Sequence, residues 1–202
     1  AAALKWLRLA AKQGYAGAQN AIGAMYDNGQ GVPQNFVKAL KWYRRAAKQG
    51  DAHAQFNLGI MYAQGQGVPQ NYAKAVKWYR LAANQGNTGA QSSLGIMYAQ
   101  GQGVPQDYAK AAKLFRLAAK QGIATAQNNL GAMYDSGQGV SQNYAKAYKW
   151  IALGKDASKP GSQAYISASR HMRILEARMT PAQIVQGQQE ASAWWAVHHK
   201  GG

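Results

Sequence analysis

Cysteine is absent from this chain of 202 residues, and acidic side chains are scarce. Without cysteine the protein has no disulfide, no thiolate metal site and no cysteine nucleophile. No apolar stretch approaches the roughly 18–20 residues that a membrane-spanning helix requires, so we expect no membrane insertion. The first residues also lack the basic segment, apolar run and cleavage site of a signal peptide.

The charge of the chain is strongly one-sided. Lys and Arg number 23 and Asp and Glu only 7, which gives a formal net charge of +16. This balance favours acidic partners or anionic surfaces, but it carries no information about the fold. Hydrophobic residues make up 47% of the chain, enough for a continuous core, and many of them are alanines that let helices approach closely.

An internal repeat organises most of the chain. The segment Gly-Gln-Gly-Val-Pro-Gln at 29–34 returns every 36 residues, at 65–70, at 101–106 and, with Ser141 in place of proline, at 137–142. A fixed period of this length predicts an array of stacked repeats. The predicted full units are 15–50, 51–86, 87–122 and 123–158. Residues 1–14 match only the last third of a unit, so we expect the first repeat to lack its opening helix.

Each unit predicts two helices, at about 52–64 and 72–85 in the second unit. Gly65 and Gly86 stand where a left-handed residue closes a helix. Pro69 forces the residue before it to be extended and stops the first helix. Asn71 then occupies the N-cap position of the second helix. Good capping residues stand at the equivalent positions of the other units: Asn35, Asp107 and Asn143.

Comparison of the four copies of the first helix separates two faces. The residues that recur in nearly every unit follow the i, i+3, i+4, i+7 spacing of one buried stripe: Gln55, Leu58, Gly59 and Tyr62. On another face the residues differ from unit to unit: His53, Phe56, Ile60 and Ala63, then Gly89, Ser92, Ile96 and Ala99, then Thr125, Asn128, Ala132 and Asp135. A face that varies while its neighbours are copied is not required for stacking, so we interpret it as the binding face.

The residues from Ala54 to Gly86 resemble the Sel1-like repeat, a relative of the tetratricopeptide repeat, through Leu-Gly-x-Met-Tyr, Gly-Gln-Gly-Val and Lys-Ala-x-Lys-Trp in order at fixed spacing. The resemblance covers about 1–158. It implies a right-handed α-solenoid, a superhelix of antiparallel helix pairs with the first helix of each unit on the concave side. It also implies adaptor or scaffold work in bacteria. Some family members carry a disulfide in each repeat, which this chain cannot form. We expect a periplasmic or secreted protein if a signal segment precedes residue 1, and a cytoplasmic one otherwise.

The C-terminal stretch, 159–202, departs from the repeat and predicts a cap of two helices, at about 162–178 and 181–199. A stacked array needs such a lid, because its last unit has no further neighbour to cover it. Thr180 is a good N-cap and Pro181 suits the first helical position. The last helix carries a stripe that predicts the covering face: Ile184, Gln188, Ala191 and Trp195.

Three recurring features have both an architectural and a functional interpretation. The glycine loops favour turn geometry over a phosphate cradle, because phosphate-binding fingerprints require other spacing. Aromatic residues of the second helix recur every 36 residues, which favours core packing over a stacking platform: Trp42, Trp78 and Trp150 with Tyr43 and Tyr79. Lysines and arginines of the same helix form a basic stripe, which is either a solvated outer face or a polyanion-binding surface. The residues of this stripe are Lys38, Lys41, Arg44, Lys74, Lys77, Arg80, Lys110, Lys113 and Arg116.

Catalytic chemistry has little support. The four histidines, His53, His171, His198 and His199, show neither metal-binding spacing nor a neighbouring pair of carboxylates, and nucleophile motifs such as Gly-x-Ser-x-Gly are absent. We therefore expect no catalytic residue, no metal and no cofactor, and keep a hydrolase only as a distant alternative.

The leading prediction is a monomeric, non-catalytic adaptor that binds a protein or peptide on its concave face, with nucleic acid as a less favoured partner. Shape-complementary contact with a few central anchors would supply the affinity, and Phe56 is the best single anchor. The predicted partner-binding residues are Asn20, Asp27, His53, Phe56, Asn57, Ile60, Gln64, Ser92, Ile96, Gln100, Asn128 and Asp135. The alternative, polyanion binding, would use Lys38, Lys41, Lys74, Lys77, Arg80, Lys110 and Lys113.

Overall fold

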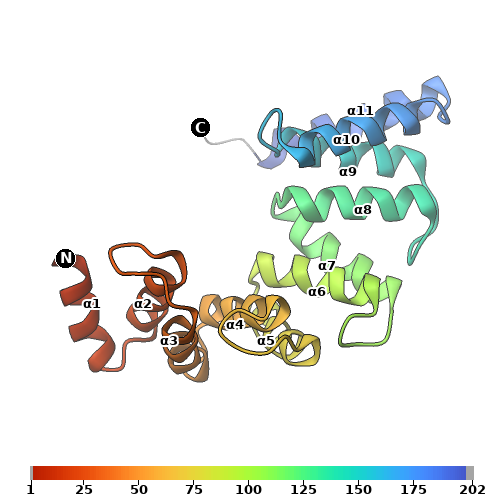
Figure 1. Cartoon of the computed structure of the whole chain (residues 1–202). Coiled ribbons are helices and arrows are strands. Elements are labelled where there is room, and N and C mark those ends of the chain that lie inside the picture. Colours follow the sequence, from red (N-terminus) through yellow and green to blue (C-terminus); the bar gives the residue numbers. More distant parts are fainter. Residues whose placement is uncertain (1, 199–202) are drawn as a thin grey trace. The chain divides into compact units, whose positions relative to one another are not determined.

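The computed structural model describes residues 2–198, and within that range the chain forms eleven α-helices and no strand (Figure 1). The helices are α1 (Ala2–Lys12), α2 (Ala16–Asn28), α3 (Phe36–Lys48), α4 (Ala52–Gln64), α5 (Tyr72–Asn84), α6 (Thr88–Gln100), α7 (Tyr108–Lys120), α8 (Ala124–Ser136), α9 (Tyr144–Asp156), α10 (Gln163–Glu176) and α11 (Pro181–His198). The predicted all-α class is confirmed.

The chain divides into two compact units, Ala1–Gln106 and Asp107–Gly202. In the first unit α2 packs against α3 and α4 against α5, and α3 also packs against α4 and α5 against α6. In the second unit α7 packs against α8, and α8 against α9. We call the first helix of each repeat helix A (α2, α4, α6 and α8) and the second helix B (α3, α5, α7 and α9).

The helix ends follow the predicted capping chemistry. The Asn71 side chain accepts a hydrogen bond from the backbone N–H of Lys74 at 2.9 Å, and the capping residues of α3, α7 and α9 do the same. Gly65 closes α4 with φ of 74°, in the left-handed region that favours glycine. Gly86, with φ of 84°, lies one residue beyond the C-cap of α5.

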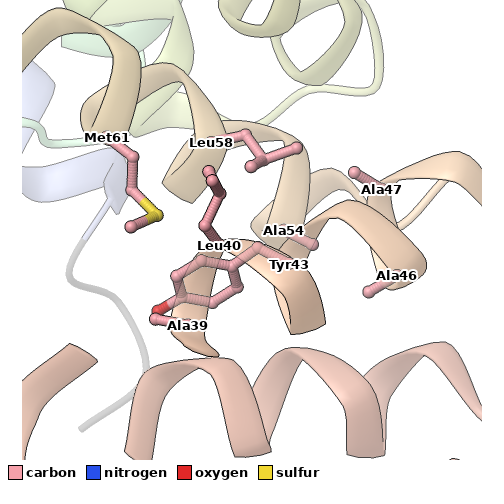
Figure 2. Close-up of a cluster of buried hydrophobic side chains, with 8 residues drawn as sticks. All are labelled: Ala39, Leu40, Tyr43, Ala46, Ala47, Ala54, Leu58 and Met61. Atoms are coloured by element: carbon pink, nitrogen blue, oxygen red, sulfur yellow. The ribbon is translucent and has the colours of Figure 1, made fainter. Parts of the chain in front are cut away.

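Small residues let the helices of a pair approach closely. In the first unit Leu40 and Tyr43 of α3 pack with Leu58 and Met61 of α4, among alanines that leave room for the larger side chains (Figure 2). Leu58 is completely buried, a position that stabilises the fold by about 1.5–3 kcal/mol relative to an exposed leucine. A Cβ atom at Gly59 would collide with the ring of Tyr79, which explains why this glycine recurs.

A buried glutamine joins each helix A to the preceding repeat. Gln55 donates to the carbonyl oxygen of Ala47 at 3.3 Å, and its own Oε1 accepts from Gln85 at 2.8 Å. Gln19 makes the same two bonds, to Ala11 and from Gln49. The recurrence of glutamine on a buried stripe thus has a structural cause, since each side-chain amide satisfies a helix end.

A tyrosine of helix A lies between two cations in several repeats. Arg44 donates to the Tyr62 hydroxyl at 2.7 Å, and the Lys74 ammonium lies 5.5 Å from the centre of the Tyr62 ring. The hydroxyl bond recurs from Arg8 to Tyr26, from Arg80 to Tyr98 and from Arg116 to Tyr134. Part of the predicted basic stripe therefore holds neighbouring repeats together.

The predicted aromatic core is confirmed only in part. Tyr43, Tyr79 and Trp150 are buried, whereas Trp42 and Trp78 are half-buried. The guanidinium of Arg45 lies 4.8 Å from the centre of the Trp42 ring, so this indole packs beneath a surface side chain. The next residue, Tyr43, faces the recurring glycine of helix A, which is Gly23 in this repeat, so the tyrosine and not Trp42 lies at the centre of the helix pair.

The two C-terminal helices pack on α9. Tyr148 and Ile151 of α9 share a cluster with Met172 and Leu175 of α10, and Ile184 of α11 packs against it. Both predicted helices are present, the first shorter than expected and the second ending at the last described residue. The start of α11 is a capping box, in which the Gln183 N–H donates to the Thr180 hydroxyl at 3.3 Å and the Thr180 N–H donates to the Gln183 side chain at 2.9 Å.

The predicted covering stripe of α11 is buried only in part. Ala191 is buried, Ile184 and Trp195 are half-buried, and Gln188 is exposed but donates to the Tyr148 hydroxyl at 3.4 Å. Trp194 stacks on the His198 ring with the ring centres 4.0 Å apart. His199 lies outside the described residues.

Candidate functional site

The predicted binding residues of the first unit come from α2, α4 and α6. We call these ten residues the helix-A surface: Asn20, Asp27, His53, Phe56, Asn57, Ile60, Gln64, Ser92, Ile96 and Gln100. α4 contacts α6, and the Asn57 amide donates to Asn20 of α2 at 3.2 Å, so α4 connects the three helices. The surface has exposed polar ends and half-buried apolar residues between them.

Exposure differs among the members of the helix-A surface. His53, Gln64 and Gln100 are exposed, while Ile60 and Ile96 are half-buried. Ser92 is buried with 6% of its surface exposed, so it offers little to a partner. Variation of this position between units could not reveal its burial.

The Phe56 ring packs against other residues of the repeat array. A Cβ atom at Gly89 of α6 would lie 2.7 Å from the tip of the Phe56 ring, so the phenylalanine covers the bare backbone of the next helix A. Its ring centre is also 5.9 Å from that of Tyr79. The pairing of Phe56 with a glycine 33 residues later makes this residue a packing element as well as a candidate anchor.

Asp27 is held by the core beneath it. The Tyr43 hydroxyl donates to its carboxylate at 3.2 Å. Burial raises the pKa of the Asp27 carboxyl, and the hydrogen bond from Tyr43 opposes that rise. Burial also raises the pKa of Tyr43 above its ordinary range, and it raises the pKa of Tyr79, which bonds Ser93, to about 12.

In the second unit, Asp135 is fully engaged within the protein. His171 contacts one carboxylate oxygen at 2.9 Å, and Arg178 donates to the other at 2.9 Å. Arg178 also donates to the Tyr144 hydroxyl at 2.9 Å, and these contacts raise the pKa of the guanidinium. Asp135 therefore links α8 to α10 and to the turn after it.

Asn128, the other predicted contact of the second unit, points inward. Its Oδ1 is buried without a hydrogen-bond partner among the described residues. A Cβ atom at Gly154 would collide with this oxygen, so a glycine in α9 makes room for the asparagine. The residue is half-buried, and its amide packs within the helix pair.

The basic stripe divides into engaged and free side chains. Lys38 and Lys74 lie over tyrosine rings, Arg80 donates to Tyr98, and Lys110 pairs with Asp107 at 2.8 Å. This contact lowers the pKa of the Asp107 carboxyl, first through the side-chain hydrogen bond from Lys110. By contrast, the exposed lysines one helical turn further on have no ion pair or ring contact within the described residues: Lys41, Lys77 and Lys113.

The described residues give little support to catalytic or metal chemistry. The His171–Asp135 pair resembles a base with its orienting group, but Arg178 occupies the second carboxylate oxygen, and residues 2–198 show no hydroxyl nucleophile bonded to His171. No group of three His, Asp or Glu side chains there could hold a metal ion. No helix of the described range is both long and apolar enough to cross a bilayer.

One cationic cavity was missed by the sequence predictions. A space of about 320 Å³ in the second unit is lined in part by Arg116, Tyr134, Ser141 and Lys146. Two features of the sequence could have located this cavity. Arginine recurs 18 residues before the tyrosine of helix A, and Ser141 is the single replacement of proline in the repeated turn.

Comparison with known proteins agrees with the geometry. The family model of the Sel1 repeat matches 1–15, 16–51, 52–87, 88–123 and 124–157. The crystal structure of c5321, a protective antigen present in uropathogenic Escherichia coli strains displaying an SLR fold, is 35% identical with a TM-score of 0.85. That match covers 96% of this chain and 40% of c5321, so the chain spans less than half the length of this relative.

Two further structures are similar. A Sel1 repeat protein from Oxalobacter formigenes is 34% identical with a TM-score of 0.73, over 90% of this chain and 74% of that one. The immunity protein Pa5087 from Pseudomonas aeruginosa, at 20% identity and a TM-score of 0.52 over 91% of this chain and 73% of its own, shares the fold alone. No curated protein matches the chain. With five matched repeats and two relatives above 30% identity, the chain belongs to the Sel1 repeat family.

Proposed function

We propose that this protein is a non-catalytic scaffold that binds a protein or peptide through the helix-A surface of its first unit. Sel1 repeat proteins are typically protein-interaction scaffolds. The observation that carries the proposal is the division of α4 into two faces. Gln55, Leu58, Gly59 and Tyr62, which recur, are buried, whereas on the varying face His53 is exposed and Phe56, Ile60 and Ala63 are half-buried.

The composition of the surface suits a protein partner. Ile60 and Ile96 offer half-buried apolar area, and along the helices the exposed polar residues His53, Gln64 and Gln100 lie before and after them. Such a patch, with an apolar centre and a polar rim, is the usual anatomy of a protein interface. Only two acidic residues belong to the first unit, and both accept internal hydrogen bonds, Asp27 from Tyr43 and Asp51 from the N–H of Ala54.

The test uses the three exposed residues His53, Gln64 and Gln100, because they have no side-chain hydrogen bond, ion pair or ring contact within residues 2–198 that would confuse binding with folding. A photo-reactive amino acid at Gln64 should cross-link a discrete partner in an extract of the native cells, and the same probe at Lys77 should not. The variant His53→Ala/Gln64→Ala/Gln100→Ala should lose at least about tenfold in affinity for that partner, as hot-spot truncations do. Its circular dichroism should be unchanged. Equal cross-linking from Lys77, or full binding by the triple variant, would remove the helix-A surface from the proposal.

A second candidate function is polyanion binding through helix B. It is favoured by the exposed lysines Lys41 and Lys77 of the first unit, which lack partners within the described residues. Binding of this kind weakens steeply with salt, because it releases counterions. Lys41→Gln/Lys77→Gln should elute from heparin at clearly lower salt than the wild type, whereas His53→Ala/Gln64→Ala should elute unchanged. Identical elution of all three proteins would exclude this function for the two lysines.

A further inference from the structure

Two adjoining cavities lie side by side around the turn that enters α9, wholly within the second unit. The first, of about 320 Å³, is lined by Arg116, Tyr134, Val140, Ser141, Gln142, Asn143 and Lys146. The second, of about 310 Å³, is lined by Gln142, Asn143, Tyr144, Ala145, Gln183 and Gln186. Gln142 and Asn143 line both, so the cavities adjoin at this turn. Each is at the lower end of the size of ligand pockets, with room for one or two amino-acid residues.

The first cavity is cationic and has no acidic wall. Arg116 uses one of its five donors on the Tyr134 hydroxyl at 3.1 Å, which leaves the other donors of the fork available. The Lys146 ammonium lies 5.6 Å from the centre of the Tyr134 ring and is exposed. Within the described residues neither cation pairs with a carboxylate. Asp135, next to Tyr134, already has both oxygens occupied by His171 and Arg178.

Serine replaces proline at this turn, and the change adds hydrogen-bond donors. Pro33, Pro69 and Pro105 have neither a backbone N–H nor a polar side chain. Ser141 lines the cavity and supplies both an N–H and a hydroxyl. The cavity thus combines an arginine and a lysine that have equivalents in other repeats with two donors that the proline turns lack.

The second cavity is lined by carboxamides with complementary free groups. Gln142 donates its amide to the carbonyl of Asp135, and Gln186 donates to Glu190, so each keeps a side-chain oxygen as an acceptor. The oxygens of Asn143 and Gln183 are used by the helix caps, which leaves their NH₂ groups as donors. Donors and acceptors side by side are what the N–H and C=O groups of an extended peptide require.

From this arrangement we propose that the two cavities form a second binding site, separate from the helix-A surface, for an extended peptide segment that carries a carboxylate. Arg116 and Lys146, with Ser141, receive the carboxylate. The carboxamides of Asn143, Gln183 and Gln186 bond the peptide backbone beside it. Arginine suits this task because its planar fork matches the two oxygens of a carboxylate.

The carboxylate has two possible sources, a Glu or Asp side chain or a peptide C-terminus, and three short peptides distinguish them. We would titrate the ¹⁵N-labelled full chain with an acetylated alanine peptide ending in glutamate amide, an acetylated alanine peptide with a free C-terminus, and the same alanine peptide amidated. At least one acidic peptide should shift the backbone signals of Ser141 and Lys146 and the side-chain signal of Gln183, with saturation. The amidated alanine peptide should not.

Variants assign the effect to the cavities. Arg116→Gln/Lys146→Gln should weaken binding of the acidic peptide at least about tenfold, the size of one or two lost charge-assisted hydrogen bonds. The matched control Lys113→Gln/Lys120→Gln removes the same charge from exposed positions of α7 and should bind as the wild type does. Ser141→Pro restores the turn of the other repeats and should weaken binding without unfolding the protein.

Three results would overturn the proposal. The first is equal shifts with the amidated and acidic peptides, and the second is undiminished binding by both Arg116→Gln/Lys146→Gln and Ser141→Pro. The third is a shift of the Ser141 and Lys146 signals by inorganic phosphate, without a shift of the Gln183 signal by any peptide. That result would show a simple anion site. A helix-A surface that failed its own cross-linking test would leave these measurements unaffected, because all their residues lie in the second unit.

Discussion

The second repeat, 51–86, and the fourth, 123–158, share one pattern of residues, yet their ends are built differently. In the second repeat Gln85 donates to the buried Gln55 at 2.8 Å, and Gly86 adopts a left-handed conformation. In the fourth repeat the equivalent positions hold alanine and serine. Gln127 is completely buried, and its Oε1 has no partner in the described range.

The fourth repeat compensates with contacts that the second does not have. Asp135 stands where the second repeat has Ala63, and it bonds both His171 and Arg178. Ser158 donates to the carbonyl of Gly154 at 2.7 Å, in place of a glycine turn. The difference shows that the fourth repeat exchanges the glutamine pair within a repeat for ionic and apolar contacts with the C-terminal helices.

The largest expected effect is the loss of an apolar contact between α9 and α10. Leu175 of α10 is completely buried against α9, so Leu175→Ala should lower the free energy of unfolding of the second unit by about 2–5 kcal/mol. Ile174, its neighbour, is 53% exposed, and Ile174→Ala should change stability by less than about 1 kcal/mol. Urea denaturation followed by Trp fluorescence would measure both. Equal effects would mean that α10 does not pack on α9 as described.

The ion pairs of Asp135 should contribute less to the free energy of unfolding. Asp135→Asn removes the charge that faces His171 and Arg178, and because Asp135 is only 14% exposed we expect a loss of about 1–3 kcal/mol. Asp27 occupies the same position of the first full repeat, and within the described residues its carboxylate bonds only Tyr43, so Asp27→Asn serves as the matched control. Chemical denaturation at neutral pH should separate the two variants. A loss as large for Asp27→Asn as for Asp135→Asn would contradict the assigned role of the ion pairs.

A glutamine amide at position 157, where the fourth repeat has alanine, should stabilise this repeat. Ala157 is the C-cap of α9, as Gln49 and Gln85 are of α3 and α5, so Ala157→Gln can offer a donor to the orphaned Gln127 oxygen. We expect a gain of about 0.5–1.5 kcal/mol in the free energy of unfolding. The converse change Gln85→Ala should cost a similar amount. Thermal unfolding of both variants checks the sign, and a destabilised Ala157→Gln would show that the glutamine cannot reach Gln127.

The smallest effect concerns pH. Burial raises the pKa of Asp27 in the folded protein above its ordinary value of 3.8, so the folded state holds this proton more tightly than the unfolded state does. The stabilisation from the protonated form is therefore complete below the ordinary pKa and is lost as pH rises through the raised pKa. Asp27→Asn should raise stability slightly at pH 7, by less than about 1 kcal/mol, and the gain should vanish in acid. A gain that persists at low pH would point to a cause other than ionisation.

Much of the fold follows from local chemistry that the sequence displays. The caps Asn71 and Thr180, the recurring Gly59 and the bounds of α4 agree with the predictions, because each depends on residues close in sequence or on a strict repeat. Burial of the indoles was predicted less well. Trp42 recurs as regularly as Tyr43 does, and recurrence alone cannot tell the central residue of a helix from one at its margin.

The candidate sites were harder to predict, because they depend on side chains brought together from distant positions. Variation between the units selected His53, which is exposed, but it also selected Ser92, which is buried, and Phe56, which covers Gly89. The carboxamide-lined cavity depends on Gln183 and Gln186 of α11, whose packing no repeat pattern encodes. Whether the helix-A surface binds a partner stays a prediction.

The hydrogen bonds between neighbouring repeats have constant separations along the chain, 18 residues from Arg44 to Tyr62 and 8 from Ala47 to Gln55. Both separations are shorter than one 36-residue period, so each bond joins a repeat only to itself or to an adjacent copy. Duplication or deletion of one whole period would therefore re-form every such bond with an equivalent residue. The protein is built so that its length can change in whole modules while its joints remain chemically the same.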